Sequence, residues 1–454
     1  MVSTRSGSSK IPDGVEKDDN RIIVVVTGAN SGFGLGICEQ LLSNLSLPPH
    51  TPIPISTPQL TALPPSLRGS FDEDEDEEPT KHIDENPPAL TLILACRSEK
   101  KALAAKQILL DKHEKELKER EEMGEEIRRG WLEDLKIVWE GVDLDNPGGG
   151  SGVLGFCEGL KARYPHITTL YLNAGMGAFT GLDWIGFFKQ NIMEGLPRAQ
   201  SQPNCQYEAK GAMSADGERG LVWGTNVLAP YIMAKELIPL LRRSPPSLPF
   251  QPRIIYTSSC TSSSSKLSSE PLNDYQLIEY EKSYSASKYM GDLIMVQLDK
   301  QYGSPSPSTS TASVDQEGGE KERPVRVFTA DPGCVATNFF MNGLGLVLWW
   351  AHFKFFFYHW SFVLCRLLGS TKHPVYADQG ALPMLYAALI PDKYLLPSSS
   401  NPAQRFTVIS ERFGDTKVGY EEVGEWEKGD ELGKGFMEAC ESHRREWRRR
   451  EGME

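Results

Sequence analysis

The sequence lacks several patterns that would assign it to a specialised class of protein. Its eight cysteines are scattered, with no C-x-x-C pair and no metal-ligand spacing, so we expect free thiols in a reducing compartment and no metal site. The first residues, MVSTRSGSSKIPDG, are polar and lack the apolar stretch of a secretory signal peptide. The formal net charge of −13 does not favour a nucleic-acid partner.

Alternating strands and helices account for most of the 454 residues. Short apolar runs, several of them rich in β-branched residues, lie at residues 21–27, 90–97, 135–144, 167–175, 253–259 and 325–333. Helical patterns separate most of them, for example at residues 35–45 and 99–122. This alternation predicts an α/β fold with one Rossmann-like, doubly wound parallel sheet in a single domain, residues 21–450, after a flexible N-terminus at residues 1–20.

Three polar stretches interrupt the alternation, at residues 47–88, 199–218 and 304–322. The first contains the acidic run DEDEDEE. Such compositions bury too little apolar surface to order a segment, so we expect three irregular surface insertions.

A fourth unusual segment, residues 344–368, is apolar and rich in aromatic residues. It is long enough for one transmembrane span, but Lys354 near its middle disfavours insertion, and aromatic side chains suit the membrane interface. We therefore predict a membrane-associating patch or hairpin. A full span, and a buried lid or dimer interface, remain as alternatives.

A glycine-rich turn, TGANSGFG, joins the first expected strand to the first expected helix. Glycines in this context allow a tight turn and let the backbone approach the pyrophosphate of a dinucleotide at the helix N-terminus. The predicted cofactor contacts in this turn are Thr27, Gly28, Asn30, Ser31, Gly32, Phe33 and Gly34.

Three later strand ends complete the predicted cofactor site. Arg97 ends the second strand, where an arginine accommodates a ribose 2′-phosphate and so favours NADP(H) over NAD, unless it only caps the strand. Asp143 ends the third strand and either bonds the adenine or caps the following helix. The small residues Asn173, Ala174 and Gly175 end the fourth strand and would let the backbone run against the cofactor.

The stretch YSASK places Tyr284 and Lys288 on one face of an expected helix. In chain order, TGANSGFG, NAG, TSS at residues 257–259, YSASK and PG at residues 332–333 resemble the short-chain dehydrogenase/reductase family. The resemblance covers most of the chain outside the insertions. It implies a Rossmann-like fold, with Tyr284 as the general acid/base and Lys288 as the cation that lowers the phenol pKa and holds the nicotinamide ribose.

The same resemblance implies further site residues. Ser259 would orient the substrate carbonyl, with Ser258 as the alternative because the gap to Tyr284 is longer than the family usually shows. Asn226 would complete a proton relay, although an asparagine that only bonds the helix backbone is the structural alternative. The predicted cofactor contacts after the last strand are Pro332, Gly333, Val335 and, against the nicotinamide carboxamide, Thr337.

Finer similarities, at residues 181–195, 221–241, 253–263, 281–293, 330–340 and 412–423, are to the 3-keto-steroid reductase subfamily of fungal ergosterol synthesis. They imply NADPH-dependent reduction of a sterol 3-oxo group to a 3β-hydroxyl during C4-demethylation. They also imply a cytosol-facing location on the endoplasmic reticulum or lipid droplets, beside the other C4-demethylation enzymes. The alternatives are a retinol or lipid-ketone reductase of the same family, and a cofactor-binding scaffold of a membrane sterol-enzyme complex.

Overall fold

The computed structural model describes residues 21–47, 88–248, 251–304, 323–337, 348–390, 392, 395, 403–413 and 415–454. The N-terminal segment 1–20, the acidic run and nearly all of the insertions predicted at 47–88 and 304–322 lie outside these residues. Within them, an eight-stranded sheet has the order β10-β9-β8-β7-β4-β1-β2-β3. All neighbouring pairs are parallel except β9 and β10, which form an antiparallel hairpin. The predicted Rossmann-like, doubly wound sheet is therefore confirmed.

The strands of this sheet are β1 (Ile22–Thr27), β2 (Leu90–Cys96), β3 (Lys136–Gly141), β4 (Thr169–Leu172), β7 (Arg253–Thr257), β8 (Arg326–Asp331), β9 (Gln404–Ser410) and β10 (Thr416–Glu422). β-Branched runs suit a sheet that is buried on both faces, and every residue of β1, β2, β4, β7 and β8 is buried. The order reverses between β1 and β4, which is the crevice where ligands bind in sheets of this kind.

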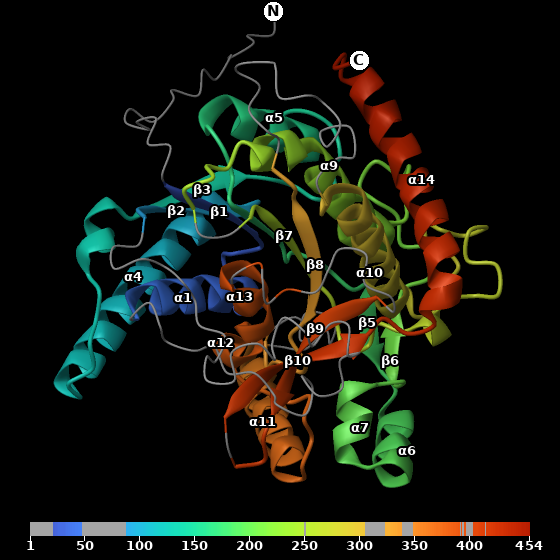
Figure 1. The fold of residues 1–454 in the computed structure, drawn as a ribbon. Helices are drawn as coiled ribbons and strands as arrows, with labels where there is room; N and C mark the ends of the chain where they lie inside the picture. The colour runs from blue at the N-terminus through green and yellow to red at the C-terminus, as the bar shows by residue number, and fades with distance from the viewer. Residues whose placement is uncertain are drawn as a thin grey trace, which may run out of the picture.

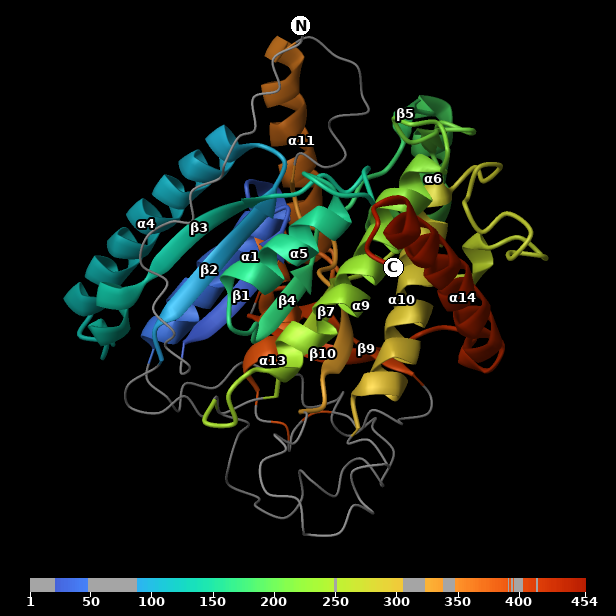
Figure 2. The same ribbon diagram turned by 90° about the horizontal axis from the view of Figure 1, so that it is seen from above.

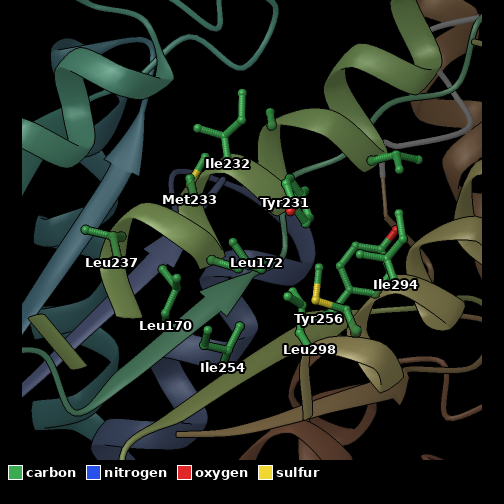
Figure 3. Close-up of a cluster of buried hydrophobic side chains, with 14 of the residues drawn as sticks. Leu170, Leu172, Tyr231, Ile232, Met233, Leu237, Ile254, Tyr256, Ile294 and Leu298 are labelled. Atoms are coloured by element: carbon green, nitrogen blue, oxygen red, sulfur yellow. The ribbon is translucent and has the colours of Figure 1, made fainter. Parts of the chain in front are cut away.

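Two hydrophobic clusters sandwich the sheet, and successive residues of β1 point into different ones. Ile23 and Val25 pack into the cluster that includes helices α5 (Val153–Arg163), α9 (Ala229–Arg242) and α10 (Ser283–Tyr302). Ile22, Val24 and Val26 pack with helices α1 (Gly32–Ser46), α4 (Glu99–Glu122) and α13 (Leu382–Leu389). Figure 3 shows part of the first cluster, where side chains of β4, β7, α9 and α10 meet. Figures 1 and 2 show the resulting helix–sheet–helix layers.

Apart from the helices at residues 184–194 and 348–367, which are described below, the longer helices are α1 (Gly32–Ser46), α4 (Glu99–Glu122), α5 (Val153–Arg163), α9 (Ala229–Arg242), α10 (Ser283–Tyr302), α13 (Leu382–Leu389) and α14 (Trp426–Arg450). Shorter helical pieces are η1 (Gly130–Asp134), α8 (Leu221–Trp223), η2 (Gly224–Leu228), η3 (Ser264–Lys266) and α12 (Ala377–Gly380). The α14 helix lies along α10 (Figure 1). Gln297 and Lys300 of α10 both donate hydrogen bonds to Asp430 of α14.

The insertion predicted at residues 199–218 is ordered, which corrects the expectation of an irregular loop. The chain after β4 forms the hairpin of β5 (Phe179–Leu182) and β6 (Gln206–Glu208), with α6 (Trp184–Glu194) and α7 (Leu196–Ser201) between its strands. Ala199, Gln200, Cys205 and Ser214 are buried. A few buried side chains and the strand pairing therefore order a stretch whose composition is polar.

Most of the apolar segment 344–368 forms α11 (Leu348–Leu367), and residues 344–347 lie outside the described part. Phe362 and Cys365 are buried against the protein, whereas Phe356, Trp360 and Leu364 are about half exposed. Among the helices that the structure describes, none combines the length and the apolarity needed to cross a membrane. The α11 helix and the α6–α7 pair lie at the same end of the molecule (Figure 1).

Candidate active site

The glycine-rich turn after β1 is as tight as the sequence predicts. Gly28 and Gly32 have φ values of +70° and +57°, a region that favours glycine. A Cβ added to Gly34 would lie 2.4 Å from the carbonyl oxygen of Gly28, so the first turn of α1 packs directly on the β1 end. Within residues 21–47, the Ser31 N-cap makes no side-chain hydrogen bond to the first helical amides. Backbone N–H groups are thus available at this helix start for an anionic ligand.

The end of β4 is bonded to the same turn. The Thr27 hydroxyl accepts hydrogen bonds from the backbone N–H groups of Asn173 and Ala174, both at 2.9 Å. The Asn173 side chain donates to the Thr27 carbonyl, also at 2.9 Å. These bonds hold the two strand ends on either side of the switch point in a fixed arrangement.

The loop after β8 reaches across to the start of α1. Gly333 has a φ of +68°, and its amide donates to Asp331 at 2.9 Å. Val335 forms a bridge with Val375, which supports the loop from behind. Thr337 Cβ lies 3.8 Å from the position that a Cβ on Gly32 would occupy. The structure therefore brings together the predicted cofactor residues of the first turn and the last loop.

The other predicted cofactor residues occupy more open positions. Arg97 is exposed immediately after β2, and Asn30 and Phe33 are half-buried in the turn. The Asp143 carboxylate accepts from the Asp145 amide at 3.2 Å, a local turn contact. That contact leaves both roles considered for Asp143 open, because a carboxylate can accept further bonds.

Tyr284 and Lys288 lie near the N-terminal end of α10, and both are buried. The Lys288 ammonium is 5.9 Å from the centre of the Tyr284 ring and donates to the Thr257 carbonyl at 2.8 Å. A Cβ added to Gly175 would lie 3.3 Å from Lys288 Nζ and 3.1 Å from Asn226 Oδ1. The end of β4 therefore passes directly over the predicted catalytic groups.

Ser258 and Ser259 have different partners, although both are buried at the end of β7. The Ser258 hydroxyl donates to Asp292 at 2.6 Å and accepts from Arg405 at 3.1 Å. The Ser259 hydroxyl forms a hydrogen bond with Tyr284 and lies 3.0 Å from the Thr261 hydroxyl. The geometry thus places Ser259, and not Ser258, beside the predicted general acid.

Asn226 sits in η2, a single π-helical turn between α8 and α9, and is fully buried. Its side chain exchanges two hydrogen bonds with the backbone of Met176, at 2.7 and 2.8 Å, and donates to Ser287 at 2.9 Å. Turns of this kind are common at functional sites, because they displace one residue from the regular helix. Here the turn directs the asparagine to the β4 end and to α10.

Burial sets the protonation states of the pair on α10. It raises the pKa of the Tyr284 phenol, and the hydrogen bond with Ser259 opposes the shift only in part. This direction differs from the expected lowering by Lys288, since the lysine donates to a backbone carbonyl rather than to the phenol. Burial lowers the pKa of Lys288 to about 8, although the negative charge of Asp292 acts to raise it. Tyr284 is therefore a protonated donor at neutral pH.

Two groups near the site were missed by the sequence interpretation. Glu208, in β6, accepts from the Tyr284 amide at 2.8 Å and from the Ser283 hydroxyl at 2.7 Å, which places a carboxylate at the N-terminus of α10. Arg405, in β9, bridges Asp292 at 3.0 Å and Glu421 at 2.9 Å. Glu208 lies in the stretch that the composition predicts to be irregular. Arg405 and Asp292 are 113 positions apart, so no local sequence pattern indicates that they pair.

Comparisons with known proteins agree with the motifs. No family model matches the chain. Over 229 residues the chain is 28% identical to the 3-keto-steroid reductase of Kluyveromyces lactis, covering 50% of this chain and 56% of the relative. Over 441 residues it is 26% identical to that of Aspergillus fumigatus, covering 94% and 87%. The chain thus spans little more than half the length of the first relative and most of the second. The predicted resemblance to 3-keto-steroid reductases is confirmed.

A solved structure is also similar. Salutaridine reductase from Papaver somniferum aligns with 82% of this chain and 97% of its own, at 17% identity and a TM-score of 0.44. That likeness is too weak to add to the fold already described.

Proposed function

We propose that this chain is an NADPH-dependent 3-keto-steroid reductase that converts the 3-oxo group of a sterol intermediate to a 3β-hydroxyl during C4-demethylation. The observation that carries the proposal is the Ser259–Tyr284 hydroxyl pair beside the buried Lys288, at the end of β7, which is the strand next to β4. A protein that only bound a cofactor would not need a protonated phenol and a second hydroxyl at this place. The names of the relatives supply the substrate class.

The residues present fit a dinucleotide. The turn from Thr27 to Gly34 offers a backbone cradle and a helix N-terminus for the pyrophosphate, and a side chain at Gly34 would fill that cradle. Arg97, exposed at the end of β2, would pair with a 2′-phosphate and favour NADP(H) over NAD. The bound nicotinamide would supply the hydride, which is chemistry that no side chain provides.

Tyr284 would supply the proton in the same step. Because burial raises its pKa, the phenol keeps its proton at neutral pH and donates it to the substrate oxygen as that oxygen gains electrons from the hydride. Ser259 would hold the same oxygen by a second hydrogen bond and align it with the phenol. Lys288 would contribute a positive charge behind the phenol and hold the ribose, while Asn226 fixes the loop after β4 against α10.

A membrane surface would supply the sterol. The helices α11 and α6 lie at the same end of the molecule (Figure 1). Both carry exposed apolar side chains, and on α6 Ile185 is 82% and Ile192 is 83% exposed. Apolar helical faces of this kind dip into the interface rather than span it. We place the protein on the cytosolic face of the endoplasmic reticulum or lipid droplets, where other C4-demethylation enzymes would be its partners.

The test is NADPH oxidation by the purified chain with a 4-methyl-3-oxo sterol, with all-trans-retinal in a parallel reaction and with product analysis. We expect sterol-dependent turnover that is lost in Tyr284→Phe. Tyr289→Phe is the matched control, because its hydroxyl lies on the same helix but donates to Gly424 at 2.6 Å. Turnover of retinal alone would move the substrate class to the retinoid alternative. Binding of NADPH without any turnover would favour the scaffold.

The membrane proposal has its own test, vesicle flotation. The double variant Ile185→Glu/Ile192→Glu should float much less than the wild type with vesicles of phosphatidylcholine and phosphatidylserine. Leu103→Glu is the control, because Leu103 is also exposed, at 55%, but lies on α4. Equal loss in both variants, or no loss in the double variant, would contradict a membrane contact through α6.

A further inference from the structure

Two cysteines from separate strand ends meet beside the candidate active site. Cys260, just after β7, and Cys334, in the loop after β8, are 74 positions apart in the sequence, but their Sγ atoms are 3.7 Å apart. A disulfide bond needs a separation of about 2.05 Å, so the sulfurs must move closer by about 1.7 Å. Within the described part of the chain, no third histidine, cysteine or carboxylate completes a metal site around them. The pair is therefore suited to redox chemistry rather than to metal binding.

The surroundings make one of the two thiols accessible and the other shielded. Cys260 is only partly buried, and its sulfur contacts the carbonyl of Ser201 at the end of α7. Cys334 is buried and packs with Phe362 of α11 and Val375. An oxidant from solvent would thus meet Cys260 first, and Cys334 is placed to react second.

The positions of the two cysteines link them to the reacting groups. Cys260 directly follows Ser259, which hydrogen-bonds Tyr284. Cys334 directly follows Gly333, whose amide is held by Asp331 at the end of β8. Any part of the closure that side-chain rotation does not supply would therefore shift the backbone next to the predicted carbonyl-orienting serine, the predicted nicotinamide loop, or both.

We infer that Cys260 and Cys334 form a reversible disulfide that switches off the candidate active site under oxidising conditions. In the first step, the Cys260 thiolate attacks a disulfide oxidant such as oxidised glutathione, which gives a mixed disulfide and releases one glutathione thiolate. In the second, Cys334 loses its proton and attacks the Cys260 sulfur, which releases the second glutathione. The two protein thiols are oxidised to one disulfide, and the oxidant is reduced to two thiols.

The size of the effect follows from the geometry of catalysis. A misplacement of about 1 Å near the reacting groups costs on the order of a hundredfold in rate. The closure here is shared between two loops, so we expect turnover to fall about tenfold or more. This readout depends on the proposed reductase function, whereas formation of the disulfide does not.

The experiment treats the purified full chain with oxidised glutathione and divides each sample. Non-reducing digestion and mass spectrometry should find a cross-linked peptide pair containing Cys260 and Cys334, lighter by two hydrogen atoms. Sterol-dependent NADPH oxidation should fall in the same samples and return after dithiothreitol. Cys260→Ser should keep its activity under oxidation, and Cys334→Ser should hold one glutathione on Cys260 without forming the cross-link. The control Cys205→Ser, which replaces a buried cysteine of the same region, should respond as the wild type does.

Each outcome bears on the inference. Absence of the cross-link in folded wild type, or its presence with unchanged turnover, would overturn the switch. If the chain turns over no sterol at all, the proposed function fails separately. NADPH fluorescence would then report whether the cross-link changes cofactor binding, and unchanged binding would overturn the switch. If a serine variant does not fold, the cross-link and its reversal in wild type still decide the matter.

Discussion

Ser258 and Ser259 are neighbours at the end of β7, and replacing each by alanine should affect a different property. Ser258→Ala should lower the stability of the fold, and Ser259→Ala should lower kcat. Ser258→Ala removes a buried hydroxyl that donates to Asp292 at 2.6 Å and accepts from Arg405 at 3.1 Å. A hydrogen bond to a charged group contributes about 1.5–3 kcal/mol, so the free energy of unfolding should fall by about 2–3 kcal/mol. The rate constant kcat should change little, because the hydroxyl faces the ion pair and not Tyr284.

Ser259→Ala removes the hydroxyl beside Tyr284 instead. Its other hydrogen bonds are to Thr261, two residues away, so the loss of stability should stay below about 1 kcal/mol. Loss of one donor to a developing oxyanion lowers kcat by roughly a hundredfold to a thousandfold. The expected pattern is therefore a stable, slow Ser259→Ala and a less stable, active Ser258→Ala.

The assay combines urea denaturation with steady-state sterol reduction for the same preparations. Double replacement should give both losses, because the two hydroxyls have no common partner among the bonds described above. The reasoning would be refuted if Ser258→Ala were as stable as wild type but catalytically dead while Ser259→Ala turned over normally. In that case Ser258, the alternative from the sequence, would be the serine that orients the carbonyl.

Turnover should fall as pH rises through about 8, because Lys288 loses its proton there while Tyr284 keeps its own, and a pH–rate profile that is flat across this range would contradict it. Gly34→Ala should weaken NADPH binding at least about tenfold, measured by fluorescence titration, since its Cβ would lie 2.4 Å from the Gly28 carbonyl oxygen. Glu208→Gln should lower kcat up to about fivefold, since removing a charge at a helix N-terminus is worth about 0.3–1 kcal/mol, while NADPH binding stays unchanged. Equal losses in kcat and NADPH affinity would instead indicate general disorder at the site.

The sheet core was predictable from sequence because its signals are local. The apolar runs at residues 21–27 and 90–97 became β1 and β2 almost residue for residue, and residues 99–122 form α4. A strand that is buried on both faces must be apolar throughout, which a short window of sequence shows directly. The β9–β10 hairpin was missed, although the residues of β10 contributed to the resemblance. Its edge of the sheet mixes buried Phe406 and Val408 with ion-paired side chains, which weakens the apolar signal.

The site was predictable only where its residues lie in contiguous motifs. The glycine turn and the pair on α10 each occupy fewer than ten positions, so their chemistry could be inferred before their geometry. Contacts between distant segments could not, because no local window contains both partners. The Cys260–Cys334 pair is an example: the sequence indicated scattered free thiols, and the fold brings two of them together. The roles of the site residues, the membrane contact and the location in the cell stay predictions.

The β5–β6 hairpin with α6 and α7, residues 179–208, contacts the candidate active site at several places. The Phe179 ring lies 5.7 Å from that of Tyr284, Glu208 binds the start of α10, and the Gln202 side chain donates to the carbonyl of Cys260. A shortened protein without these residues would therefore lose the contacts of Phe179, Glu208 and Gln202 with the candidate active site. The exposed residues Ile185 and Ile192 of α6 make none of these contacts, so the membrane test alters them without removing a contact to the candidate active site. Residues 179–208 thus combine strands bonded to the candidate active site with an exposed apolar helix, so one segment would join the proposed membrane contact to the proposed catalytic groups.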